Sequence, residues 1–153
     1  MSEAGDDLAA QANGVLGQLI PVAASMGVEF TAVRRGFVQA TVPFEGNANH
    51  FGVVYAGVIF TVAEVLGGAL HLATFDASTH YPLVKSVQID FLAPGTSRLT
   101  ATASLPDAEL ERMAAAAATG AKVPFVLEAE VVGADGVLVA RTRGDYQLRP
   151  FGA

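Results

Sequence analysis

GVVYAGVIFTVAEVLGGALHLATF, residues 52–75, is the most apolar stretch of the chain, yet it carries a carboxylate, Glu64, near its middle. Burying an unpaired charge in such surroundings costs free energy, so the pKa of the buried group often shifts until the group is neutral. The stretch is long enough to span a bilayer. However, Glu64, His71, the glycines and the lack of flanking Lys or Arg argue against a lipid-facing helix. We therefore expect the buried central helix of a soluble protein, starting near residues 54–57.

The composition excludes several classes of protein. Hydrophobic residues make up 52% of the 153 residues and charged residues 16%, which excludes a disordered chain. The mean hydropathy of +0.43 predicts that another subunit covers part of the apolar surface. The net charge of −6 argues against nucleic-acid binding. The chain has no cysteine, which excludes disulfides and thiolate chemistry, and its acidic start is not typical of a signal peptide, so we expect a cytoplasmic protein.

The remaining segments read as further helices and strands. Residues 1–26 form an expected N-terminal helical segment, in which Asp6 or Asp7 caps a helix to about Ile20 and Pro21 restarts a short one. Residues 106–120 read as an inserted helix, with proline and acids at its start and a glycine at its end. The loop after the central helix, residues 74–82, should place His80 at the surface. Alternating apolar and polar residues predict strands at 28–33, 37–44, 83–94, 98–105, 123–132 and 137–148.

These elements predict an α+β fold. The sequence predicts about six antiparallel strands with one apolar face and one helix that is apolar all round. A single arrangement buries both apolar surfaces. In it, a curved sheet wraps around a long central helix. Because no repeat, linker or domain boundary is visible, we expect residues 1–153 to form a single domain.

Glu64 shares one face of the predicted helix with glycines and a histidine. At 3.6 residues per turn, Gly57, Glu64 and His71 lie in line, and Gly68 lies beside them. Glycines next to a carboxylate leave room for a ligand to approach the helix. From spacing alone, a structural acid paired with an arginine of the last strand is an equally good interpretation.

Residues 49–64, NHFGVVYAGVIFTVAE, resemble the signature of hotdog-fold acyl-CoA thioesterases of the phenylacetate-pathway type. That signature joins an Asn, a His-Gly-Gly and an Asp or Glu further along the helix. Asn49, Gly57 and Glu64 match it, while Tyr55 and Ala56 replace its His and first Gly. The likeness continues in LVKSVQIDFLAPG and VVGADGVLVARTRGDYQL, and so covers most of the chain from residue 28 onward. The inserted helix resembles a less characterised branch of the same superfamily.

The resemblance implies hydrolysis of an acyl-CoA or related acyl thioester, without a cofactor or a metal. Glu64 would be the general base or nucleophile, and the Gly57 N–H at the helix start would polarise the thioester carbonyl. Asn49 would orient the water or the carbonyl. The residues expected to contact the substrate are His50, Tyr55, Ala56 and Gly68.

Helix geometry adds a requirement for a second subunit. Seven residues separate Gly57 from Glu64 by about 10 Å, so one thioester carbonyl cannot contact both groups of the same helix. The hypothesis therefore requires a homodimer with two shared sites, or a tetramer of two such dimers. Basic side chains should hold the phosphates of coenzyme A. The sequence does not rank the candidates, which are Lys85, Arg98, Lys122, Arg141 and Arg143.

Three alternatives to hydrolysis at Glu64 stay open. Glu64 could be a structural acid paired with Arg141 or Arg143. His50, followed by a phenylalanine, could act with Glu64 as in hotdog dehydratases of 3-hydroxyacyl thioesters. The two departures from the thioesterase signature also suit a non-catalytic module that binds acyl thioesters or lipids.

Overall fold

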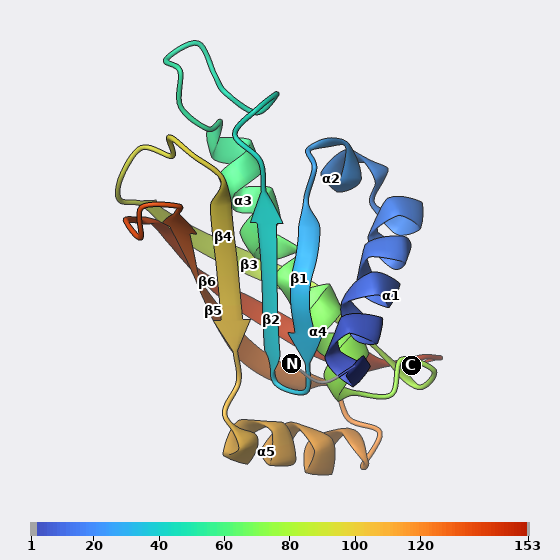
Figure 1. Cartoon of the computed structure of the whole chain (residues 1–153). Coiled ribbons are helices and arrows are strands. Elements are labelled where there is room, and N and C mark those ends of the chain that lie inside the picture. Colours follow the sequence, from blue (N-terminus) through green and yellow to red (C-terminus); the bar gives the residue numbers. More distant parts are fainter. Residues whose placement is uncertain (1–2, 153) are drawn as a thin grey trace.

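The computed structural model describes residues 3–152 of the chain. Within them, six strands form one antiparallel sheet in the order β1-β2-β4-β5-β6-β3. Figure 1 shows this sheet curving around the central helix, which confirms the predicted α+β fold. The strands are β1 (Glu29–Arg34), β2 (Phe37–Val42), β3 (His80–Phe91), β4 (Leu99–Ser104), β5 (Val123–Gly133) and β6 (Leu138–Pro150).

The central helix consists of α3 (Ala56–Glu64) and α4 (Leu66–Thr74). The sequence predicts an uninterrupted helix, whereas the structure has a local break at Val65, directly after Glu64. Val65 keeps right-handed helical angles (φ −64°, ψ −15°), so α4 continues from α3. The break therefore alters the local hydrogen bonding without redirecting the chain.

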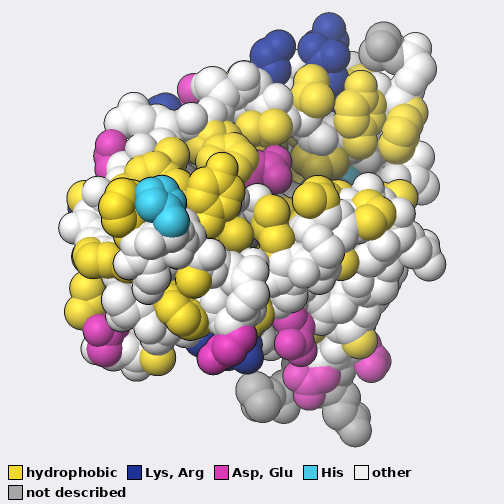
Figure 2. All heavy atoms as spheres, turned by 90° about the horizontal axis from the view of Figure 1, so that it is seen from above, with side chains coloured by type: hydrophobic (Ala, Val, Ile, Leu, Met, Phe, Trp, Pro, Cys, Tyr) yellow, Lys and Arg dark blue, Asp and Glu magenta, His cyan; other side chains and the backbone are white. Residues whose placement is uncertain are grey.

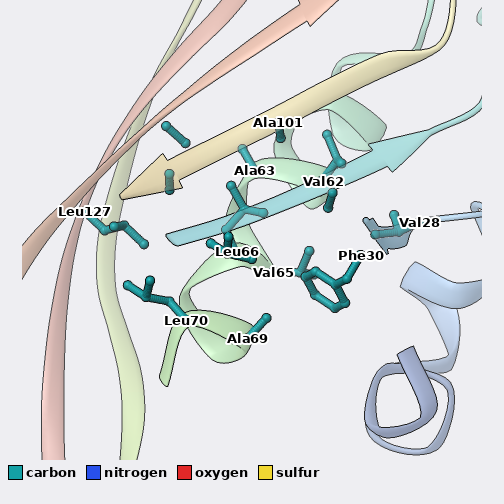
Figure 3. Packing of buried hydrophobic residues seen from close by; sticks show 14 of the residues in the cluster. Val28, Phe30, Val62, Ala63, Val65, Leu66, Ala69, Leu70, Ala101 and Leu127 are labelled. Atoms are coloured by element: carbon teal, nitrogen blue, oxygen red, sulfur yellow. The ribbon is translucent and has the colours of Figure 1, made fainter. Parts of the chain in front are cut away.

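One side of the central helix forms the centre of the core. Leu66 is fully buried and Leu70 is 1% exposed. In Figure 3, Leu70 lies near Leu127 of β5, and Val65 lies near Phe30 of β1. By length and composition Ala56–Thr74 could cross a membrane, but 56% of its most apolar window is buried inside the fold. This burial is the pattern of a core helix, as the sequence predicts.

The strands β5 and β6 show why the sheet has one apolar face. Along β5, buried and exposed residues alternate from Val123 to Val131, and β6 follows the same rule from Ala140 to Leu148. Because side chains of a strand point alternately to its two faces, the buried set faces the central helix and the polar set faces solvent. The alternation that predicted these strands therefore also decides which face of the sheet packs on the central helix.

The N-terminal helices are α1 (Glu3–Leu19) and α2 (Pro21–Ser25), within the predicted segment 1–26. The predicted cap is wrong, because Asp6 and Asp7 lie inside α1 and so cannot cap it. The helix α1 packs along β1 and touches α4 (Figure 1). The ends of the predicted domain, residues 1–2 and 153, lie outside the described residues.

The inserted helix α5 (Asp107–Ala117) lies within the predicted residues 106–120, past the end of β4 (Figure 1). Asp107 and Glu109 lie in its first turn, where carboxylates oppose the helix dipole. Leu110 and Met113, three residues apart, share one face and are buried. These two side chains attach the inserted helix to the rest of the fold.

The loop predicted between the central helix and the next strand is shorter than expected. The strand β3 already begins at His80, which is half-buried, so its predicted place in a surface loop is wrong. Pro82 lies within β3, which a proline tolerates because β3 is an edge strand. Proline was the misleading signal, since it was interpreted as ending the loop.

Candidate active site

Glu64 ends α3 on the side of the central helix that the sheet leaves uncovered. Its side chain is half-buried, and one turn further on, Gly68 is exposed, with no atom within 4 Å of where a Cβ would be. His71, which we expect from the sequence to face the core or an interface, is buried at 6% exposure. Viewed from above, Figure 2 shows hydrophobic side chains gathered in a broad patch around an acidic side chain. The structure therefore holds a carboxyl group in an apolar but open setting.

The Glu64 carboxylate has no ion pair and no side-chain hydrogen bond within residues 3–152. Burial raises the pKa of this carboxyl above its ordinary value of 4.5. The predicted alternative of a structural ion pair is contradicted for this protomer. The two arginines pair with other acids: Arg141 with Glu130 and Arg143 with Asp145, each at 3.3 Å.

Tyr146 of β6 supports the backbone at Glu64, a role that the sequence analysis missed. Its hydroxyl donates a hydrogen bond of 3.4 Å to the main-chain carbonyl of Glu64, beside the break at Val65. Burial, and then the charge of Glu64, raise the pKa of the Tyr146 hydroxyl. The ring lies so close to Gly67 that an added Cβ would stand 2.6 Å from it. Strand alternation could have identified Tyr146 as facing the helix, since Gly144 and Leu148 are buried on the same face.

We expect Gly67→Ala to lower the free energy of unfolding by about 1–3 kcal/mol, because the buried Tyr146 ring has no room to move aside. Gly68→Ala is the matched control. It places the same methyl group in open space on the same helix and should raise the free energy of unfolding by up to about 1 kcal/mol. Urea denaturation measures both, and equal effects from the two variants would contradict the packing of Tyr146 on Gly67.

Two backbone donors are free at the start of the central helix. Tyr55 is the N-cap, and its carbonyl accepts from the N–H groups of Val58 and Ile59 at 2.9 and 3.2 Å. The N–H groups of Ala56 and Gly57 have no acceptor in the described part of the chain. The Tyr55 ring covers Gly57, where a Cβ would stand 2.6 Å from it, so the space predicted beside this glycine is filled by the chain's own tyrosine.

The loop before α3 holds Asn49 and His50, whose roles toward a substrate stay predictions. The Asn49 side-chain oxygen accepts hydrogen bonds from the N–H groups of Phe51 and Val53 at 2.9 and 3.4 Å, so it closes the loop on itself. His50 is exposed and packs on the Phe51 ring, with centroids 3.9 Å apart. A second asparagine, Asn47, anchors the loop by donating to two backbone carbonyls. Nothing in the sequence separated this structural Asn from Asn49.

The cations that the sequence could not rank fall into two groups. Arg141 and Arg143 pair with acids, and Arg98 donates to the Thr41 hydroxyl at 3.2 Å. Lys85 and Lys122 form no ion pair within the described residues. In the same residues, no group of three or more His, Asp or Glu could hold a metal ion.

The structure thus places Gly57, Tyr55 and Ala56 at one end of α3 and Glu64 with Gly68 at the other end. Seven residues of helix separate Gly57 from Glu64, which corresponds to a rise of about 10 Å. Beside Gly68, an apolar cavity of about 480 Å³ opens between α1, α4 and the start of β3. The uncovered face of one protomer therefore offers an acid and a cavity at one end, and free donors at the other.

Comparisons with known proteins identify relatives of this chain. The model of the DUF4442 family, a domain of unknown function, matches residues 10–148. A Pseudomonas aeruginosa protein of unknown function, described as a probable thioesterase, is 31% identical, with 92% of this chain and 94% of that chain covered and a TM-score of 0.85. No curated protein matches.

Two more distant structures share the fold. A thioesterase of Haemophilus influenzae is 20% identical, covers 90% of each chain and has a TM-score of 0.69. A Chlorobaculum tepidum protein of unknown function is 19% identical, with 95% of this chain and 96% of that chain covered and a TM-score of 0.83. These likenesses confirm the predicted resemblance to hotdog thioesterase-like proteins at the level of the fold.

Proposed function

The chain belongs to the DUF4442 family, and from that premise we propose that it hydrolyses an acyl-CoA thioester with Glu64 as the general base or nucleophile. Structural neighbours named as thioesterases support thioester hydrolysis in general. The observation that carries the assignment to Glu64 is its unpaired, half-buried carboxyl on the open face of the central helix. A structural carboxyl in such a place would be expected to have a partner.

The surroundings of Glu64 suit proton transfer. Desolvation raises its pKa toward the range in which a carboxylate is an effective base at neutral pH. As a base, Glu64 takes a proton from water, and the resulting hydroxide attacks the thioester carbon. The carbon–sulfur bond then breaks, and the proton on Glu64 passes to the leaving thiolate, which yields a carboxylic acid and coenzyme A.

The attack places negative charge on the carbonyl oxygen, and the start of α3 offers donors for it. The N–H groups of Gly57 and Ala56 are free, and they lie at the positive end of the helix dipole. Because Gly57 lies about 10 Å from Glu64 of its own helix, the donor must come from a second subunit.

The edge of the sheet supports such a dimer. The edge strands are β1 and β3, and α1 packs along β1. The strand β3 leaves a twelve-residue edge free, and it exposes Val84 at 37% and Phe91 at 50%. Long, exposed edge strands tend to pair with another chain. We propose that β3 pairs with β3 of a second copy, which brings the two central helices to one interface.

An assay with two readouts tests the proposed hydrolysis. Purified protein is incubated with a panel of acyl-CoAs and 3-hydroxyacyl-CoAs, and free thiol and enoyl products are followed separately. Hydrolysis predicts thiol release without enoyl formation. Enoyl formation that depends on His50 would support the dehydratase alternative, and tight binding without either product would support a binding module.

A pH-dependent stability effect should accompany the raised pKa of Glu64. The folded-state pKa lies above the ordinary value of 4.5, so the folded state holds this proton more tightly than the unfolded chain. Stability from this group is therefore complete below about pH 4 and declines as the pH rises through the folded-state pKa. We expect Glu64→Gln to raise the Tm at about pH 8 and to change it little at about pH 4.

Glu111→Gln is the matched control for this stability measurement, because Glu111 is exposed on α5. Its effect on the Tm should not grow between the two pH values. A Glu64→Gln variant that is less stable than wild type at the higher pH would show that the carboxylate has a favourable partner after all.

A further inference from the structure

The cavity beside Gly68 starts one helical turn beyond Glu64 and runs away from it along the central helix. Gly68 follows Glu64 by four residues, so the two lie on the same side of the helix, and Gly68 lines the cavity. The lining from the central helix extends from Val65 to Leu72, which corresponds to a rise of about 10 Å. A group that reacts at Glu64 can therefore carry a long substituent into this cavity.

The helix α1 forms the opposite wall of the cavity. It lies beside α4 (Figure 1), and its part of the lining runs from Ala12 to Leu19. Leu16 of this wall is buried in the core, whereas Val15 and Leu19 are exposed although they line the cavity. Exposed apolar side chains that line a cavity are removed from water when an apolar ligand covers them. The wall therefore favours a ligand that extends along α1.

The cavity has no charged wall. None of the described residues that line it is a Lys, Arg, Asp or Glu. His71 and His80 belong to the wall, but the Nε2 atoms of both rings are buried, so a ligand in the cavity does not meet them. Burial lowers the pKa of His71, which keeps this ring neutral near pH 7. With a volume of about 480 Å³, the cavity thus suits an uncharged hydrocarbon chain.

We propose that the cavity holds the hydrocarbon tail of an unbranched acyl chain, so that the substrates are medium- and long-chain acyl thioesters. A short acyl group bound at Glu64 would end beside Gly68 and would leave Val15 and Leu19 uncovered. An aromatic acyl group would fill the part next to Gly68 without extending along α1. Only a flexible, extended chain covers the whole wall. This inference rests on the proposed hydrolysis, so its test has one arm without turnover and one with it.

The first arm measures binding alone. Decyl-CoA and butyl-CoA are thioethers that cannot be hydrolysed, and calorimetry gives the Kd of the wild-type protein for each. We expect decyl-CoA to bind about a hundredfold more tightly or better, because each buried methylene contributes about fourfold to affinity. Equal affinities of the two thioethers would overturn the subsite.

Gly68→Leu tests where the tail lies. Gly68 lines the cavity, and a Cβ added there meets no atom within 4 Å, so leucine should fold normally while it fills the cavity next to Glu64. The affinity ratio of the two thioethers should fall to about tenfold or less. Gly17→Leu is the matched control, because Gly17 is exposed on α1, has equal space and does not line the cavity. A ratio that falls in both variants or in neither would overturn this placement of the tail.

Leu19→Gln tests the part that α1 plays in the wall. Leu19 lines the cavity and is 74% exposed, so the substitution should leave the fold intact. We expect the affinity ratio to fall by about threefold or more, because the amide replaces an apolar contact of the tail. Val22→Gln is the matched control, at a side chain that is 61% exposed on α2 and outside the cavity lining. Equal ratios in the two variants would exclude α1 from the subsite.

The second arm measures thiol release from decanoyl-CoA, butyryl-CoA and phenylacetyl-CoA. We expect kcat/KM for decanoyl-CoA to exceed both other values by about a hundredfold, for the same reason as in the binding arm. Tighter binding of decyl-CoA without thiol release from any of the three thioesters would sustain the subsite and refute the hydrolase. Equal, measurable kcat/KM for all three would overturn the subsite and leave hydrolysis standing.

Discussion

Glu64→Gln is expected to lower kcat for acyl-CoA hydrolysis by about a thousandfold, within the range that a general base contributes. The amide has the same shape as the carboxylate, but it cannot take a proton from water. Because no hydrogen bond or ion pair of the described chain depends on the Glu64 carboxylate, the variant should fold normally. Thiol release under saturating acyl-CoA measures the effect.

Two controls separate chemistry from folding in this experiment. Glu111→Gln, at the exposed position on α5, should leave kcat unchanged. The circular dichroism spectrum and the elution volume of Glu64→Gln should match those of wild type. If Glu64→Gln keeps wild-type thiol release while it folds normally, the assignment of the catalytic acid is wrong.

Gly57→Pro is expected to lower kcat by about 10²–10³-fold, the usual cost of one lost oxyanion donor. Proline removes the N–H that we assign to the carbonyl oxygen, and it is tolerated in the first turn of a helix because those N–H groups lack helical acceptors. The measurement is kcat for the same acyl-CoA, with KM determined alongside it.

Gly57→Ala is the matched control, because it adds a Cβ at the same position and keeps the N–H. In both variants the new Cβ would stand 2.6 Å from the Tyr55 ring. Tyr55 is 57% exposed, so its ring can move aside in either variant. A loss of activity in Gly57→Ala as large as that in Gly57→Pro would assign the effect to the displaced ring and contradict the donor role.

The fold could be predicted from the sequence because two periodicities were unambiguous. Residues 52–75 are apolar all round, and the strands alternate, so burial alone requires the sheet to wrap around the helix. The limits of the elements depended on weaker local signals. Asp6 and Asp7 looked like caps but lie inside α1, and Pro82 looked like the end of a loop but lies in an edge strand.

The break in the central helix and the surroundings of its glycines depend on tertiary packing, so the spacing of residues in the sequence could not predict them. The break at Val65 lies where Tyr146 reaches the Glu64 carbonyl, a contact between residues 82 positions apart in the chain. Gly57, Gly67 and Gly68 look alike in the sequence. In the structure, Gly57 lies under the Tyr55 ring, Gly67 lies under the Tyr146 ring and Gly68 faces open space. Only Gly68 leaves the room that we expected from the sequence beside Gly57 and Gly68.

Whether Glu64 forms an ion pair with an arginine could be decided only from the register of the strands. Arg141 lies directly opposite Glu130 across β5 and β6, and Arg143 lies two residues from Asp145 on the same strand. Both pairs are on the solvent-facing side, and side chains there cannot reach the helix inside the sheet. The sequence shows that the two arginines are present, but only the alternation of side chains along the strands places both of them on the face away from Glu64.

A heterodimer tests most directly the central claim that Glu64 of one subunit acts with Gly57 of the other. Glu64→Gln and Gly57→Pro chains, each nearly inactive alone, are co-expressed with different tags, and the mixed dimer is purified. A site shared across a two-fold axis gives this dimer one intact site and one doubly altered site, so we expect about half of the wild-type activity. A mixed dimer as inactive as its parents would contradict the shared site.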